Sequence, residues 1–243
     1  MTTATPEYRT RPHAWQTSVW ARAVRRLGRH WVINRHVTRY CRPLTVARAP
    51  SRKLRGPAVV IVNHTSHFDT PLALSVLPEP LRSRTAVAAA ADRFYREGKR
   101  GWWFSLFFNT FPIDRRGGGA STLDYPLSLL GRGWSVLIYP EGTRSESGRL
   151  GEFHHGAAFL AMRARVPVIP ICSEGLRGVM PKGQRSPQPS AVRVRIGAPV
   201  WLDDVPSITE GTSRLERIMR TLAGETAPSR RDLVQPVLAG RVG

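Results

Sequence analysis

The stretch NHTSHFD, Asn63 to Asp69, places two histidines and one aspartate within six positions. Asp69 could hold either His64 or His67 in one tautomer and stabilise its protonated form, as an acid/base pair requires. The same side chains could also contribute to a metal site. A third ligand is then needed, and the sequence has no HExxH motif to supply it. From this stretch alone, catalysis, metal binding and a purely structural turn remain open, with His154 and His155 as metal ligands only if the fold brings them there.

Two further stretches combine arginine with glycine. In YPEGTRSESG, Glu141, Gly142, Thr143 and Arg144 follow an apolar run. Glycine allows close approach of the backbone, and a guanidinium can bind a phosphate through two hydrogen bonds. The alternative is a plain turn with an exposed salt bridge. In FPIDRRGGG, two adjacent arginines precede three glycines, which indicates either a second phosphate site or a flexible basic loop.

Short apolar runs alternate with helical stretches from residue 57 onward, which predicts an α/β domain with a mixed, largely parallel sheet. Polar residues after these strands then gather at the carboxyl edge of the sheet, where α/β proteins build their sites. The predicted strands are 57–62, 85–90, 134–140, 166–171 and 191–197, and the predicted helices are 70–77, 121–130, 152–164 and 207–223.

Residues 14–40 predict a basic amphipathic helix in front of this domain. Val19, Trp20, Val24 and Leu27 share one helical face, and Arg25 lies on the opposite side. Such a helix is typical of elements that lie in a membrane interface. It fits equally well a helix that packs its apolar face on the domain and leaves its arginines in water. The aromatic segment 101–111 could contact the membrane, line an acyl-chain groove or belong to the core.

Charge is the unusual feature of the composition. The 243 residues carry a net charge of +20, almost all of it from arginine. This surface attracts an anionic membrane, a phosphorylated substrate or nucleic acid, unless it reflects only an arginine-rich composition. The basic residues are dispersed, and neither a zinc finger nor an RNP-like strand is present, which argues against nucleic acid.

The remaining features favour a cytosolic setting. Two separate cysteines suggest reducing conditions, and the polar first fourteen residues fit no secretory signal. No apolar run reaches the roughly 18 residues that a transmembrane helix needs.

The order NHTSHFD, PIDRRGG, YPEGTRS and VPVIPI resembles the four sequence blocks of the glycerolipid acyltransferase family, over roughly residues 45–205. That family includes the enzymes that convert lysophosphatidic acid to phosphatidic acid. His64 and Asp69 fit the first block, histidine–four residues–aspartate. Pro140 to Ser145 match the third block without departure.

The resemblance implies roles for these residues. His64 would be the general base, oriented by Asp69, and His67 would only shape the turn. The acceptor phosphate and glycerol would be bound by Arg115 (or its neighbour Arg116), Glu141, Gly142, Thr143 and Arg144. The acyl donor would be acyl-CoA or acyl-carrier protein, with no metal and no other cofactor. Another lipid acceptor, such as a lyso-ornithine lipid or a glycolipid, fits the same blocks, and a metal-dependent hydrolase is a remote alternative.

The resulting organisation has three parts. Residues 1–44 would form a polar N-terminus and a membrane-interfacial helix, residues 45–225 the acyltransferase domain, and residues 226–243 a flexible tail. The expected location is the cytoplasm, peripheral on the inner face of the cell membrane.

Overall fold

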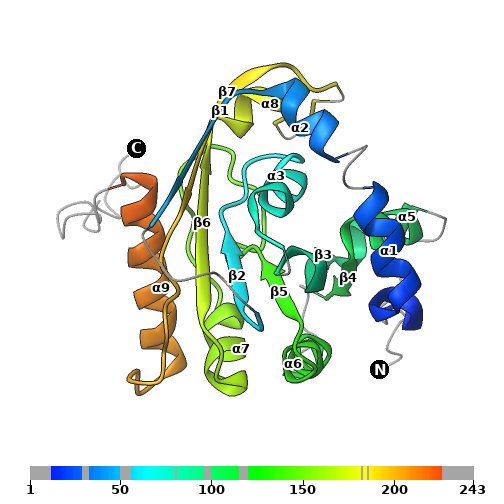
Figure 1. Cartoon of the computed structure of the whole chain (residues 1–243). Helices are drawn as coiled ribbons and strands as arrows, with labels where there is room; N and C mark the ends of the chain where they lie inside the picture. The colour runs from blue at the N-terminus through cyan, green and yellow to red at the C-terminus, as the bar shows by residue number, and fades with distance from the viewer. Residues whose placement is uncertain are drawn as a thin grey trace, which may run out of the picture.

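The structure, a computed structural model, describes residues 12–28, 33–49, 56–79, 81–95, 100–114, 120–181, 183–184 and 186–225. Within them, seven strands form one sheet in the order β1-β7-β6-β2-β5-β3-β4 (Figure 1). Every neighbouring pair is parallel except β6 with β7, which confirms the mixed, largely parallel sheet. The strands are β1 Cys41–Arg48, β2 Val59–Val62, β3 Thr85–Ala90, β4 Thr110–Ile113, β5 Ser135–Ile138, β6 Val168–Glu174 and β7 Ser190–Ile196.

Helices cover both faces of the sheet, and the central strand β2 shows how the core divides. Val60 and Val62 pack in one buried cluster with residues of α2, α3 and α8. Val59 and Ile61 point the other way, into a cluster with residues of α6, α7 and α9. The longer helices are α1 Val19–Gly28, α2 Asn34–Tyr40, α3 Asp69–Val76, α5 Arg100–Phe108, α6 Asp124–Gly131, α7 Gly156–Ala164 and α9 Ile208–Ala223. Shorter turns are η1 Ala14–Thr17, η3 Arg82–Arg84, α4 Ala91–Phe94, η4 Ala120–Leu123 and α8 Leu176–Val179.

The strands with a regular apolar pattern lie where the sequence predicts them. In β7, Val192, Val194 and Ile196 are buried and Arg193 is exposed, as the alternation predicts. Two strands escaped prediction. β1 contains Pro43, and its apolar residues Leu44 and Val46 are exposed, so no buried apolar face marks it as a strand. β4 begins two residues after the aromatic helix α5, so the apolar sequence continues from helix to strand without a visible boundary.

The N-terminal segment differs from the single amphipathic helix expected over 14–40. The chain forms η1, α1 and α2 there, and residues 29–32 lie outside the described ranges. The orientation of α1 is the reverse of an ordinary packed helix. Arg25 is 1% exposed, and its guanidinium donates to the carbonyl oxygens of Gln16 and Ser105.

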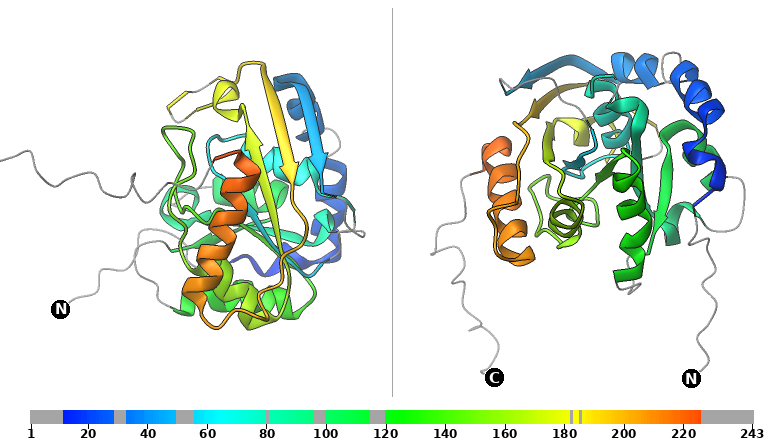
Figure 2. Two further views of the ribbon diagram at one scale, coloured as in Figure 1. Left: turned by 90° about the vertical axis from the view of Figure 1, so that its left-hand side faces the viewer. Right: turned by 60° about the horizontal axis from the view of Figure 1, so that its bottom comes forward.

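The apolar side of α1 faces outward, with Val19, Trp20, Val24 and Leu27 all exposed. Packing of this apolar face on the domain is therefore wrong. α1 lies against α5 at one end of the sheet, as Figure 1 and the right-hand view of Figure 2 show. Among the described residues, no helix combines the length and the hydropathy needed to span a bilayer.

Candidate active site

The candidate site lies where the parallel strands β2 and β5 end side by side. The loop after β2 carries residues 63–68 and leads into α3, and the loop after β5 carries residues 139–155 and leads into α7. Because parallel neighbours end at the same sheet edge, the NHTSHFD and YPEGTRS stretches meet there although 70 residues or more separate them.

His64 and Asp69 form a close pair. Nδ1 of His64 lies 2.7 Å from Oδ2 of Asp69, which is 1% exposed. The same oxygen accepts the backbone N–H groups of Thr65, at 2.7 Å, and Ser66, at 2.8 Å. An ionised carboxylate only accepts hydrogen bonds, so Nδ1 must carry the proton. Nε2 of His64 is then the basic atom.

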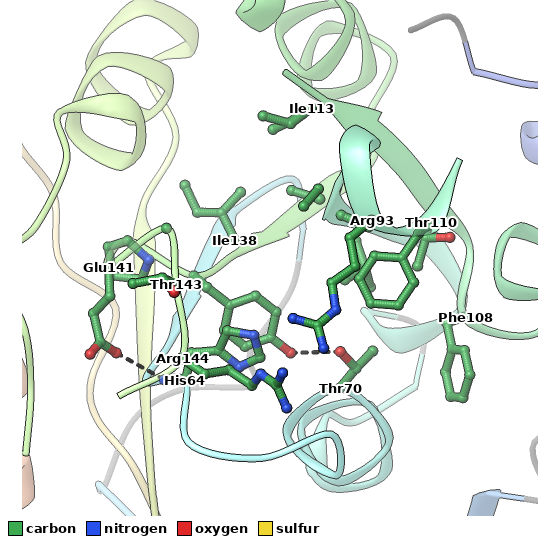
Figure 3. Close-up of a pocket in the computed structure, with 18 of the residues that line it drawn as sticks. His64, Thr70, Arg93, Phe108, Thr110, Ile113, Ile138, Glu141, Thr143 and Arg144 are labelled. Atoms are coloured by element: carbon green, nitrogen blue, oxygen red, sulfur yellow. Dashed lines mark hydrogen bonds between the residues drawn. The ribbon is translucent and has the colours of Figure 1, made fainter. Parts of the chain in front are cut away.

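The ring of His64 is held from one side by an aromatic stack. Tyr139 lies with its ring centroid 4.1 Å from that of His64, at an interplanar angle of 22°. The Tyr139 hydroxyl is 2.7 Å from Oγ1 of Thr70 (Figure 3). Burial, and to a lesser degree the charge of Asp69, raises the pKa of Tyr139, so the side chain stays a neutral phenol. Tyr139 therefore fixes the ring plane of His64 without adding a charge.

Glu141 links the two loops through the backbone. Its Oε1 accepts the N–H of His64 at 2.8 Å, and its Oε2 accepts the N–H of Gly151 at 2.9 Å. The N–H of Ser145 donates to the carbonyl oxygen of His64 at 2.7 Å. Burial raises the pKa of the Glu141 carboxyl, and the two N–H groups oppose that rise. Both backbone groups of His64 are thus bonded to the YPEGTRS loop.

Gly142 has a structural reason to be glycine. Its φ is +66°, and a Cβ there would come within 2.9 Å of the His154 ring. The ring of His154 lines the same cavity. The ring of His155 lies elsewhere and is hydrogen-bonded to the Thr212 hydroxyl.

Arg144 is a buried cation without a partner. It is 6% exposed, and neither Nη1 nor Nη2 makes a hydrogen bond. Burial, together with the charge of Arg93, lowers its pKa, but an arginine remains charged. Arg93 comes from α4, and its guanidinium points toward the same part of the cavity beside His64 (Figure 3). Two cations facing one space are an anion-binding arrangement.

The structure distinguishes the two histidines. His64 bonds Asp69, whereas the pKa of His67 is lowered to about 4 by partial burial and by the charges of Arg144, Arg93 and His64. His67 is therefore neutral near pH 7. It lies beside Arg144 and Arg93, and the Asp69 carboxylate bonds His64 instead.

These groups line one cavity of about 770 Å³. Its polar end holds His64, Thr143, Arg144 and Arg93. The rest of its wall is mainly apolar, from β3, α4, α5 and the ends of β4 and β5: Val87, Ala88, Ala89, Ala90, Phe94, Phe104, Phe108, Ile113, Leu123 and Ile138.

Most of the predicted site residues meet in this cavity. His64, Glu141, Gly142, Thr143 and Arg144 line it, and Asp69 lies directly behind His64. Arg115 and Arg116 lie outside the described residues. Within the ranges that are described, no group of three or more His, Cys, Asp or Glu side chains could hold a metal ion.

Two residues of the site were not predicted, Tyr139 and Arg93. Tyr139 begins the YPEGTRS stretch, but nothing in the sequence indicates that it stacks on His64. Arg93 follows the predicted strand 85–90 and so lies at the same sheet edge as the other loops, which is the signal that could have found it.

An α/β domain in which a buried aspartate holds a partly exposed histidine beside unpaired arginines defines a class of candidate transferases and hydrolases. The comparisons with known proteins narrow that class. The family model described as Acyltransferase matches residues 20–174, and the chain belongs to this acyltransferase family.

Several relatives of this chain are named 1-acyl-sn-glycerol-3-phosphate acyltransferases. The chain is 31% identical over 166 residues to the mouse 1-acyl-sn-glycerol-3-phosphate acyltransferase alpha, covering 63% of this chain and 55% of that protein. It is 32% identical over 144 residues to the putative 1-acyl-sn-glycerol-3-phosphate acyltransferase acl-2 of Caenorhabditis elegans, covering 58% and 49%. The chain thus spans about half the length of these relatives.

A solved structure shares the fold. The crystal structure of the 1-acyl-sn-glycerophosphate (LPA) acyltransferase PlsC from Thermotoga maritima superposes with a TM-score of 0.62 at 22% identity. The match covers 84% of this chain and 78% of that one.

Proposed function

We propose that the protein is an O-acyltransferase that moves a fatty acyl group from an acyl thioester to a hydroxyl of a lysophospholipid. The observation that carries the proposal is the His64–Asp69 pair in one cavity with the buried, unpartnered guanidinium of Arg144. The His64–Asp69 pair supplies a base, and the Arg144 guanidinium supplies a binding group for an anionic acceptor. The names of the relatives support 1-acyl-glycerol-3-phosphate as that acceptor, with phosphatidic acid as the product.

The proposed chemistry needs one base and no covalent intermediate. Nε2 of His64 takes the proton from the acceptor hydroxyl as its oxygen attacks the thioester carbonyl. The C–S bond then breaks, the acyl oxygen ester remains, and the imidazolium returns its proton to the leaving thiolate. Asp69 stabilises the imidazolium throughout. A positioned base typically contributes about 10²–10⁴-fold to the rate. No cofactor takes part in this scheme; the acyl donor, acyl-CoA or acyl-carrier protein, is a co-substrate.

We assign the acceptor phosphate to the polar end of the cavity. Arg144 would bind it with two hydrogen bonds, and Arg93 would add a second positive charge. Thr143 adjoins this space and could donate to the same group. Arg115 remains a predicted third phosphate ligand. For Glu141, the two backbone N–H groups that it already accepts favour an indirect role, in which it positions His64.

The apolar wall of the cavity suits a fatty acyl chain. Phe104 and Phe108 of α5 belong to this wall, and Trp102 and Trp103 of the same helix are exposed on the outside. Helix α5 therefore has one side on the cavity and another on the surface.

We further propose that α1 and α5 rest on a membrane surface. Their exposed residues form an apolar patch, which we call the α1–α5 patch: Val19, Trp20, Val24, Leu27, Trp102 and Trp103. Trp15 joins the two helices, with ring centroids 5.5 Å from Trp20 and 5.7 Å from Trp102. The clustered tryptophans, on a chain whose net charge is +20, favour peripheral binding to an anionic bilayer.

The test is an acceptor panel with one labelled acyl-CoA, read by mass spectrometry. Lysophosphatidic acid, a lyso-ornithine lipid and a glycolipid are compared, because all three offer a hydroxyl but only the first offers a phosphate monoester. Acylation of lysophosphatidic acid that is lost in His64→Ala supports the proposal. Transfer to none of the acceptors from either acyl-CoA or acyl-carrier protein, or activity governed by added metal and chelator, contradicts it.

A further inference from the structure

The C-terminal end of α9 holds the loop that carries Arg144. Glu225, just beyond α9, accepts the backbone N–H of Leu150 through Oε1 at 3.0 Å. Nη1 of Arg220 lies 3.1 Å from Oε2 of Glu225 and 3.5 Å from the carbonyl oxygen of Leu150. A charged pair therefore holds both backbone groups of one loop residue.

The Arg220–Glu225 pair is mostly buried, and a second ion pair holds Arg220. The side chains of Arg220 and Glu225 are only 17% and 16% exposed. Glu216, one turn earlier in α9, binds Arg220 at 2.7 Å and fixes it from the other side. A partly buried, networked ion pair keeps more of its strength than an isolated surface pair, because water screens it less.

From Leu150 the contacts lead to His64. The next residue, Gly151, donates its N–H to Oε2 of Glu141, and Oε1 of Glu141 accepts the N–H of His64. Glu141 is 6% exposed, so an oxygen that lost its N–H partner could not easily replace it with water. A shift of the Leu150–Gly151 backbone would therefore move the carboxylate that holds the main chain of His64.

We propose that Glu225, paired with Arg220, is a positioning residue for the acyl transfer reaction. It fixes the Leu150–Gly151 backbone, and the Gly151 N–H in turn holds the Glu141 carboxylate in place to accept the N–H of His64. The inference rests on the proposed function of His64 as the base. Glu225 and Arg220 lie beyond residues 20–174, the part matched by the acyltransferase family model, and in none of the sequence blocks.

The experiment compares Glu225→Ala and Glu225→Gln with Asp204→Asn as a matched control. Asp204 is an exposed acid just before α9 that pairs with Arg214 of that helix. Glu225→Ala is expected to lower kcat on the order of tenfold, because small displacements of a catalytic group are costly, with acceptor KM changed less than about twofold. Glu225→Gln should recover part of the loss, since its amide oxygen can still accept the Leu150 N–H. Asp204→Asn should behave as wild type.

Coupling to Glu141 separates positioning from general stabilisation. In a Glu141→Gln background, Glu225→Ala should cost much less than it does alone, because the route to His64 is already impaired. An equal, additive loss would overturn the inference. So would a Glu225→Ala protein that melts earlier but keeps its full kcat well below the melting temperature.

Hydrogen exchange gives a readout independent of activity. The amides of Leu150 and Gly151 should exchange faster in Glu225→Ala than in wild type, and unchanged exchange would overturn the inference. If the wild-type protein transfers acyl groups to no acceptor, the proposed function fails, but the exchange result still reports whether Glu225 holds the loop.

Discussion

Replacing Arg144 by methionine should weaken acceptor binding and stabilise the free protein. The buried guanidinium has two nitrogens without hydrogen-bond partners, so the unliganded fold carries the cost of a desolvated charge. Methionine keeps an unbranched chain of similar reach and removes that charge. The same change removes the group that we assign to the acceptor phosphate.

The expected magnitudes follow from these two effects. A hydrogen bond to a charged group contributes about 1.5–3 kcal/mol, which corresponds to a rise of roughly 10- to 150-fold in acceptor KM. Relief of an unsatisfied buried charge should gain about 1–2 kcal/mol, or roughly 2–8 °C in Tm for a domain of this size. Loss of affinity together with a gain in stability would be the sign of a functional residue kept at a structural cost.

The assay measures acceptor KM at saturating acyl-CoA, together with thermal unfolding without lipid. Arg149→Met is the control, because Arg149 lies on the same loop but is exposed. The control should change neither quantity appreciably. An unchanged KM in Arg144→Met would refute the assignment of Arg144 to the phosphate, and a lower Tm would refute the structural cost of its unpaired charge.

Three further predictions concern other parts of the molecule. His64→Ala should abolish turnover and His67→Ala should reduce it far less, measured as kcat on folded protein; equal losses would contradict the His64–Asp69 assignment. The pKa of His67 is about 4 in the fold against its ordinary value of 6.5, so as the pH falls the unfolded state binds a proton before the folded state does. Stability should therefore decrease as the pH falls from about 6.5 toward 4, and His67→Gln should flatten this slope in denaturant titrations at several pH values. Replacing Trp20, Leu27 and Trp103 together by serine should reduce sedimentation with anionic liposomes while leaving turnover of a short-chain, soluble acceptor intact; unchanged sedimentation would place the membrane contact elsewhere.

The sequence predicted those parts of the fold in which periodicity and burial agree. The strands 85–90 and 191–197 and the helix 207–223 carry clear patterns and form almost as expected. β1 has no such pattern, because it is held by parallel pairing with β7 rather than by burial of its own side chains. α1 shows a different limit. Its strong apolar face fitted both packing on the domain and a membrane interface, and only the hydrogen bonds from Arg25 show that this face turns away from the core.

For the candidate site, the spacing of histidine and aspartate was the informative part. Five positions across a loop-to-helix turn bring His64 and Asp69 to 2.7 Å, as the sequence suggested. The sequence could not indicate what surrounds them. The stacking of Tyr139, the approach of Arg93 and the hydrogen bond that the Leu150 N–H donates to Glu225 all join segments that are distant along the chain. Only the arrangement of the strands determines these contacts.

The geometry makes the two sequence motifs one unit rather than a catalytic block and a binding block. Arg144 lies between Glu141, which accepts the N–H of His64, and Ser145, which donates to the carbonyl oxygen of His64. The base and the proposed phosphate ligand are therefore spaced by backbone hydrogen bonds and not by flexible side chains alone. Under the proposed function, this fixed spacing would select acceptors whose hydroxyl lies at one distance from their phosphate. A substitution such as Glu141→Gln should then impair turnover and acceptor selectivity together, because it changes the spacing between His64 and Arg144 rather than either group.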